Sequence, residues 1–296
     1  MTWVIYSLIA AIATAVIGIL DKMVLAKWMT KPTGSFFVFS VIETASGVIA
    51  LALLGWPRLN GGQMSIALLS GAAFAAASLC YFEAVKVEEI SRVGPLFSLS
   101  PIFVAVFAAV FLGEVFTVRQ YLGVLLLTGG AFLLSLKSLR DWRFGRGLWW
   151  MLLGVGLISA GAVASKYLLD TSRPWTVFAY TKLGTIIIAL PLLVPGYRSL
   201  AESVRGSGPR VLVYSGLSEG LTSITTIFFL LAASTGYITL VNALIGTQPF
   251  FLLFLTVLLS AYWPKILQEE ISRRLILRKA VAIAGIFAGI WLVTAA

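Results

Sequence analysis

The sequence predicts an all-α polytopic membrane protein, and two observations carry that prediction. Of the 296 residues, 59% are apolar and only 11% are charged, with a mean hydropathy of +0.99. A soluble domain is about one quarter charged, so this composition disfavours a water-exposed fold. The chain also divides into ten apolar segments, each close to the roughly 20 residues that a membrane-crossing helix needs.

The ten predicted spans follow one another through short connections, which leaves little room for a soluble domain. Nearly all are apolar around the whole helix, as expected of spans rather than of helices that lie on a membrane surface. No basic segment precedes the first one and no convincing cleavage site follows it, so we expect it to be retained. Their approximate bounds are Thr2–Lys22, Gly34–Gly55, Ser65–Val85, Arg92–Gly113, Val118–Leu136, Gly147–Leu169, Trp175–Pro195, Arg210–Ala233, Ile238–Tyr262 and Arg278–Ala295.

The two halves of the chain resemble each other: residues 1–136 form a first five-span repeat, 137–146 a basic linker and 147–296 a second repeat. Pro101 and Pro249 lie at matching positions 148 residues apart, and Lys22 and Lys166 match at 144 residues. Because five is an odd number, the second repeat must cross the membrane in the opposite orientation. Inverted repeats of this kind place the substrate site at their interface, near the middle of the bilayer.

The basic residues indicate the same inversion. Of 22 lysines and arginines, 16 lie in or beside loops that follow odd-numbered spans, and only Arg58, Arg119 and Arg173 follow even-numbered ones. The positive-inside rule then predicts cytoplasmic odd-side loops and both termini outside. Because the net charge of +10 is scattered over short loops, we expect anionic membrane lipids rather than nucleic acid as its partner.

Composition also argues against most enzyme classes. The chain has no histidine and a single cysteine, Cys80, which excludes Ser-His-Asp and Cys-His nucleophiles and histidine-ligated metals. It has no phosphate-binding loop of the ATPase kind. The acidic pairs Glu88-Glu89 and Glu269-Glu270 lack partners for a clustered catalytic site. We therefore expect no enzyme activity, no cofactor and no metal.

The run Tyr81-Phe82-Glu83-Ala84-Val85-Lys86 and three further runs resemble the EamA-type transporters of the drug/metabolite transporter superfamily. A weaker second copy keeps Gln248-Pro249-Phe250, whereas Gln268-Glu269-Glu270 replaces the glycine-glutamate pair of the first half. The resemblance implies ten helices around a central cavity, alternating access, and amino acids or related metabolites as substrates. The matching runs are Tyr81-Phe82-Glu83-Ala84-Val85-Lys86, Ser98-Leu99-Ser100-Pro101-Ile102-Phe103, Phe111-Leu112-Gly113-Glu114 and Thr128-Gly129-Gly130-Ala131.

Ionisable residues within or at the edges of spans are the candidates for substrate binding and coupling. An unpaired charge at the centre of a membrane helix costs roughly 2.5–3.5 kcal/mol. Glu43 lies near the middle of the second span, and Lys182 lies in the seventh, its counterpart, so the two are predicted to face each other. We hypothesise that Glu43 or Glu219 accepts a proton that is coupled to transport; a structural ion pair of Glu43 with Lys182 or Lys22 is the alternative. The full set is Asp21, Lys22, Glu43, Glu83, Lys166, Lys182 and Glu219. Glu83 lies one turn from Lys86 near the end of the third span, so a local ion pair is expected for this residue.

Lys22 and Lys166 occupy equivalent positions near span ends, where they either attract a carboxylate or phosphate or reach the membrane interface. Tyr81, Asn242 and Gln248 are candidate cavity-lining groups.

The matching prolines carry a separate prediction. Pro101 and Pro249 interrupt the fourth and ninth spans, and we predict kinks that act as hinges. The pattern Gly285-Ile-Phe-Ala-Gly289 predicts packing of the tenth helix on the fifth rather than a dimer interface.

Taken together, the residues and the resemblance predict a secondary-active transporter that exports or exchanges a small polar or amphipathic metabolite. One alternative is a carrier or flippase for a phosphorylated or lipid-linked headgroup, and a membrane scaffold is another. We expect a multi-pass protein of a bacterial or archaeal cytoplasmic membrane, as a monomer or a homodimer.

Overall fold

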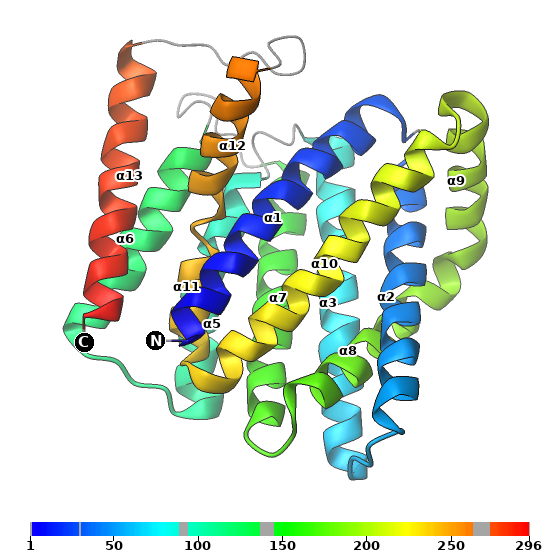
Figure 1. Cartoon of the computed structure of the whole chain (residues 1–296), viewed down its shortest axis with the longest axis horizontal. Coiled ribbons are helices and arrows are strands. Elements are labelled where there is room, and N and C mark those ends of the chain that lie inside the picture. The colour runs from blue at the N-terminus through cyan, green and yellow to red at the C-terminus, as the bar shows by residue number, and fades with distance from the viewer. Residues whose placement is uncertain (1, 30, 89–93, 137–144, 263–272, 296) are drawn as a thin grey trace.

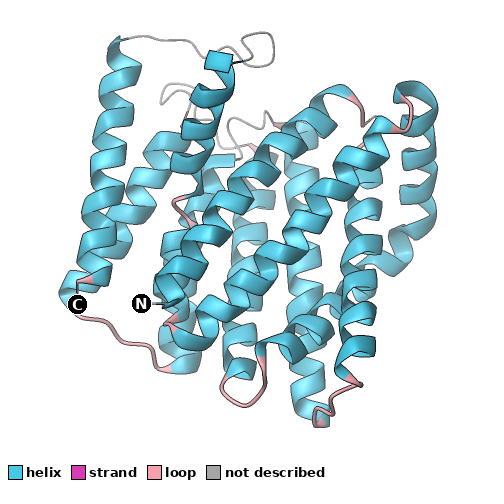
Figure 2. Ribbon diagram, viewed as in Figure 1, coloured by secondary structure: helices cyan, strands magenta, loops and turns pink. Residues whose placement is uncertain are grey.

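A computed structural model describes residues 2–29, 31–88, 94–136, 145–262 and 273–295. These residues form helices joined by short loops, with no strand among them (Figure 2). Nine segments of the described chain are long and apolar enough to cross a membrane, and Lys279–Thr294 is a shorter apolar segment. The prediction of an all-α polytopic membrane protein is confirmed.

The first half of the chain contains five spans in order (Figure 1). The hydroxyl of Thr117 and the amide of Asn60 cap the helices that follow them, each in a reciprocal capping box with a glutamine three residues later. The helices are α1 (Thr2–Lys27), α2 (Pro32–Leu54), α3 (Gly61–Val87), the 3₁₀ segment η1 (Gly94–Leu99) with α5 (Ser100–Leu112), and α6 (Val118–Ser135).

The second half also supplies five spans. Its helices are α7 (Arg146–Leu169), α8 (Pro174–Ala189) with η2 (Leu190–Leu192) and α9 (Leu193–Ser207), α10 (Arg210–Thr235), α11 (Ile238–Ile245) with α12 (Gln248–Tyr262), and α13 (Arg273–Thr294). Successive spans run in alternate directions, so the two termini lie at the same end of the molecule (Figure 1).

The seventh span differs from its prediction. The sequence pattern predicts an end at Pro195 and a connection up to Arg210, whereas the structure continues as helix to Ser207. Pro191 divides this span, because a proline fits the first turn of a new helical segment but not a helix interior. The added helix α9 is polar on one side, where Lys31 Nζ lies 3.1 Å from Glu202 Oε2.

The fourth and ninth spans are each divided into two helical segments rather than kinked. Pro101 lies in the first turn of α5, after the 3₁₀ segment η1, and Pro249 lies in the first turn of α12, after Gly246 and Thr247. A proline at the start of a helix removes no helical hydrogen bond. The predicted kinks are therefore wrong in form: at both prolines one helical segment ends and another begins.

The contacts between helices are nearly the same when each helix is replaced by its counterpart in the other half of the chain. Helix α1 packs along α10 as α3 packs along α7, and α2 contacts α10 as α8 contacts α3. In two further contacts, α2 with α8 and α6 with α13, a helix packs on its own counterpart. This pattern supports the division into residues 1–136 and 147–296, which stays a proposal.

Close helix contacts depend on small residues. An added Cβ at Gly289 of α13 would lie 2.8 Å from the Gly123 carbonyl oxygen of α6, so the tenth helix packs on the fifth as predicted. At the crossing of α3 and α8, a Cβ at Gly184 would meet the Leu68 carbonyl oxygen at 2.1 Å. The backbones there touch directly.

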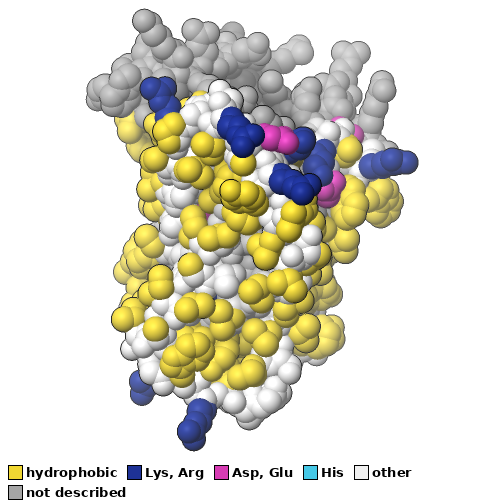
Figure 3. Space-filling view, turned by 90° about the vertical axis from the view of Figure 1, so that its right-hand side faces the viewer, with side chains coloured by type: hydrophobic (Ala, Val, Ile, Leu, Met, Phe, Trp, Pro, Cys, Tyr) yellow, Lys and Arg dark blue, Asp and Glu magenta, His cyan; other side chains and the backbone are white. Residues whose placement is uncertain are grey.

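The outer surface is apolar between two charged ends (Figure 3). Side chains such as Leu53, 82% exposed, and Val115, 79% exposed, face outward and would be costly in water. The prediction that Lys and Arg residues mark the cytoplasmic side stays a prediction.

Candidate functional site

A buried ion pair joins α2 to α8. The Glu43 carboxylate comes from α2 and the Lys182 ammonium from α8, and they are 3% and 4% exposed. Glu43 lies eleven residues from the start of α2, which is about 16 Å along the helix axis. The predicted pairing of Glu43 with Lys182 is present.

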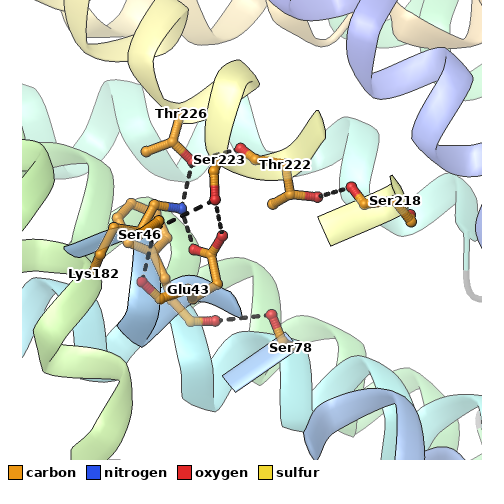
Figure 4. Close-up of polar contacts among 9 residues, drawn as sticks. Glu43, Ser46, Ser78, Lys182, Ser218, Thr222, Ser223 and Thr226 are labelled. Carbon is orange, nitrogen blue, oxygen red and sulfur yellow. Dashed lines mark hydrogen bonds and ion pairs between the residues drawn. The ribbon is translucent and has the colours of Figure 1, made fainter. Parts of the chain in front are cut away.

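Hydroxyl groups of α10 complete the coordination of both charges (Figure 4). Ser223 Oγ donates to Glu43 Oε1 at 2.9 Å, and Lys182 Nζ donates to Thr226 Oγ1 at 2.9 Å. The Lys182 ammonium also lies 5.4 Å from the centre of the Phe178 ring. Each charge thus has its counter-ion and a neutral polar partner, which buried charges require.

These hydroxyls belong to a polar stripe on α10. Its members recur at intervals of three and four residues, so they share one face of the helix. One member of the stripe, Ser218, donates from its Oγ to Asp21 Oδ1 of α1 at 2.6 Å. The stripe comprises Ser215, Ser218, Glu219, Thr222, Ser223 and Thr226.

A small pocket adjoins the stripe on the side from which α10 begins. It is lined by Asp21, Val24, Ser35, Phe82, Ser215 and Glu219. Its volume of about 10 Å³ is room for about one water molecule.

The predicted site residues separate into those near the ion pair and those elsewhere. Glu219 lies on the stripe, four residues before Ser223, and lines the pocket together with Asp21. The side chain of Lys22 lies outside the described residues.

Lys166 is not part of this cluster. Its Nζ donates to the Ala233 carbonyl at 2.8 Å, near the end of α10, where a cation satisfies free helix carbonyls. Ala233 lies ten residues beyond Ser223, about 15 Å along the helix. The structure gives Lys166 a helix-capping contact and no contact with the ion pair.

Three further predicted residues occupy different surroundings. Tyr81 packs its ring on Phe97, with centroids 5.4 Å apart. Asn242 Oδ1 accepts a hydrogen bond from Ser100 Oγ at 3.0 Å. Gln248 Nε2 donates to the Thr14 carbonyl at 3.3 Å, joining α12 to α1.

The two predicted hinge regions meet each other. Pro101 Cγ lies 3.5 Å from the position of an added Cβ at Gly246, so the breaks in the fourth and ninth spans are in contact. Ser100, beside Pro101, bonds Asn242 of α11 and lies 3.3 Å from Ser159 Oγ of α7. A polar contact thus joins three spans where two of them are broken.

Two features were missed by reasoning from the sequence. The α10 hydroxyls Ser223 and Thr226 were not selected, although their helical spacing with Glu219 was a usable signal. Glu114, 6% exposed, accepts hydrogen bonds from the backbone N–H of Ile238 at 3.0 Å and of Thr239 at 3.4 Å. Its carboxylate caps the start of α11, and only the fold brings those positions together.

Comparisons with known proteins identify the family. A crystal structure described only as that of a protein superposes on all of this chain and 98% of its own, with a TM-score of 0.73 and 17% identity, which shows the shared fold. The "Uncharacterized transporter in cobO 3'region" of Sinorhizobium sp. is 31% identical over 137 residues, which are 45% of this chain and 96% of that protein. The model of the EamA-like transporter family matches residues 1–136. This chain therefore belongs to the EamA-like transporter family, within the drug/metabolite transporter superfamily, and is an integral multi-pass membrane transporter.

Proposed function

We propose that this transporter is secondary-active and exports or exchanges a small zwitterionic metabolite, an amino acid or a related compound, by alternating access. The observation that carries the proposal is the buried Glu43–Lys182 pair with its α10 hydroxyls. It holds one anion and one cation where helices of both halves meet.

The charge balance of the pair favours a zwitterion. A substrate ammonium replaces Lys182 as the partner of Glu43, and a substrate carboxylate replaces Glu43 as the partner of Lys182. This exchange leaves the net charge of the membrane interior unchanged, so it avoids the cost of an unpaired buried charge.

The position of the pair suits alternating access. Glu43 belongs to the first half, and Lys182, Ser223 and Thr226 belong to the second. In inverted-repeat carriers the two units rock about a fixed central site. The contacting breaks near Pro101 and Gly246 are the hinges in this mechanism.

Counterflow in liposomes tests the function. Purified protein is reconstituted in vesicles loaded with one unlabelled amino acid at a time, and uptake of the labelled compound is followed with and without a pH gradient. We expect saturable counterflow for at least one amino acid. A pH gradient that drives uptake in wild type but not in a Glu43→Gln or Glu219→Gln variant would assign the coupling proton.

Variants then test the role of the pair. Glu43→Gln and Lys182→Met are expected to lower the initial rate by at least about tenfold, equivalent to about 1.4 kcal/mol. Glu83→Gln is the matched control, because Glu83 pairs with Lys86 at a half-exposed helix end and should retain the wild-type rate. Equal rates in all variants would refute the assignment of the pair, and counterflow of phosphorylated headgroups alone would refute the zwitterion.

A further inference from the structure

We propose that the pocket between α1, α2 and α10 is a binding site for a small monovalent cation, held by Asp21, Glu219, Ser35 and Ser215. The cation is either a free ion such as Na⁺ or the ammonium group of a substrate, which present the same chemistry to these oxygens. The site is separate from the Glu43–Lys182 pair, and its role in coupling or recognition rests on the proposed transport function.

Unsatisfied hydroxyls are the first observation. Ser35 and Ser215 are 7% and 4% exposed, and neither side-chain oxygen has a hydrogen-bond partner in the described structure. Both residues line the pocket. Buried polar groups are nearly always satisfied, so two unsatisfied oxygens at one small pocket indicate a ligand that supplies the missing interaction.

Unbalanced charge is the second observation. Asp21 accepts a hydrogen bond from Ser218, and Glu219 has no hydrogen bond or ion pair among the described residues. The one described ammonium nearby, that of Lys182, is paired with Glu43. Both side chains are half-buried within membrane-spanning helices, where a carboxylate is expected to be paired, metal-bound or protonated, and a cation between Asp21 and Glu219 meets that requirement.

The size of the pocket selects the cation. Ca²⁺ takes six to eight oxygen ligands and Mg²⁺ keeps several waters, whereas the four polar side chains of this pocket of about 10 Å³ carry six oxygens, one of which, Asp21 Oδ1, already accepts a hydrogen bond from Ser218. That volume fits a water-sized species: a small ion, or the tip of an ammonium group that donates three hydrogen bonds.

The helix register separates the pocket from the ion pair. Ser35 precedes Glu43 by eight residues on α2, and Ser215 precedes Ser223 by eight on α10, which is about 12 Å in each case. The two helices run in the same direction (Figure 1). The pocket and the pair are therefore two neighbouring layers along α10, and Glu219, four residues or about 6 Å before Ser223, lies between Ser215 and Ser223 on the helix.

Binding to the purified full-length protein tests the site without transport. Titration calorimetry in N-methylglucamine buffer uses sodium chloride in one arm and methylammonium chloride in another, with calcium chloride as a third. We expect saturable binding of Na⁺, of methylammonium, or of both, and the arm that saturates identifies the source of the cation. Saturation by Ca²⁺ alone, or by none of the three, would overturn the proposal.

Four variants localise the binding. Asp21→Asn, Glu219→Gln and the double change Ser35→Ala with Ser215→Ala are each expected to weaken it by at least about tenfold. Ser40→Ala is the matched control, because Ser40 is also buried on α2 but donates to the Phe36 carbonyl at 2.7 Å. Unchanged binding in the first three variants would place the cation elsewhere.

Lys22 provides a final discrimination. If binding appears only after Lys22→Met, a side-chain cation already fills the site and the proposal is wrong. A wild-type protein that transports amino acids but binds no cation would likewise refute this site and leave the proposed function standing.

Discussion

The two polar layers of the bundle differ in how their charges are compensated. In the Glu43–Lys182 layer, each charged group has a counter-ion and a hydroxyl partner within the protein. In the Asp21–Glu219 layer, two carboxylates and two unsatisfied hydroxyls face a pocket. Where every polar group has a partner within the protein, the layer needs no ligand. Where polar groups lack partners, the missing interactions are supplied only when a ligand binds. The comparison predicts that mutations in the two layers have different effects on stability.

The largest effect is expected from breaking the ion pair. Lys182→Met leaves Glu43 as an unpaired buried charge and should lower the free energy of unfolding by about 3–5 kcal/mol. Because Cys80 is buried and is the one cysteine in the sequence, a thiol-reactive dye reports thermal unfolding. The double variant Glu43→Gln with Lys182→Met should recover most of the loss. A double variant as unstable as Lys182→Met would show that the unpaired Glu43 charge is not what destabilises the protein.

A smaller effect is expected from Ser223→Ala. The substitution removes a hydrogen bond to the charged Glu43 carboxylate, which contributes about 1.5–3 kcal/mol. The same dye assay should show a drop between those of Lys182→Met and wild type. Ser40→Ala is a suitable control, because the buried Ser40 hydroxyl, also on α2, donates to the Phe36 backbone carbonyl of its own helix at 2.7 Å. An unfolding temperature equal to that of wild type would mean that Ser223 does not stabilise the pair.

The smallest effect is expected in the open layer. Ser35→Ala and Ser215→Ala remove hydroxyls that have no partner in the described structure, so in ligand-free buffer their stability should change by less than about 1 kcal/mol, in either direction. Saturating cation should raise the unfolding temperature of wild type more than that of the double variant, because a ligand that binds only the native state stabilises it. A large loss of stability without cation would contradict the distinction between the layers.

Sequence reasoning recovered what depends on local composition. The ten spans follow from apolar runs, and the Glu43–Lys182 contact follows from two charges that are costly in lipid at matching positions. The rotation of each helix about its axis is set by packing on its neighbours. The sequence therefore did not reveal that Lys166 reaches Ala233, or that Ser223 and Thr226 face the pair.

The sequence predicted where the fourth and ninth spans are interrupted, but it predicted kinks instead of separate helical segments. Pro101 and Pro249 marked the sites, whereas the 3₁₀ segment before α5 and the turn at Gly246 depend on the contact between the two spans. The capping of α11 by Glu114 joins residues more than 120 positions apart, and no local pattern encodes such a pairing.

The hydrogen bonds of Glu114 couple the end of the fourth span to the beginning of the ninth. Glu114 follows α5 directly, and its carboxylate is bonded to the first turn of α11 by the N–H groups of Ile238 and Thr239 and by the Thr239 hydroxyl. If the C-terminal end of the fourth span is displaced, the N-terminal end of the ninth must move with it, or all three hydrogen bonds break. In the proposed alternating-access mechanism, the fourth span of one half and the ninth of the other therefore move as one unit.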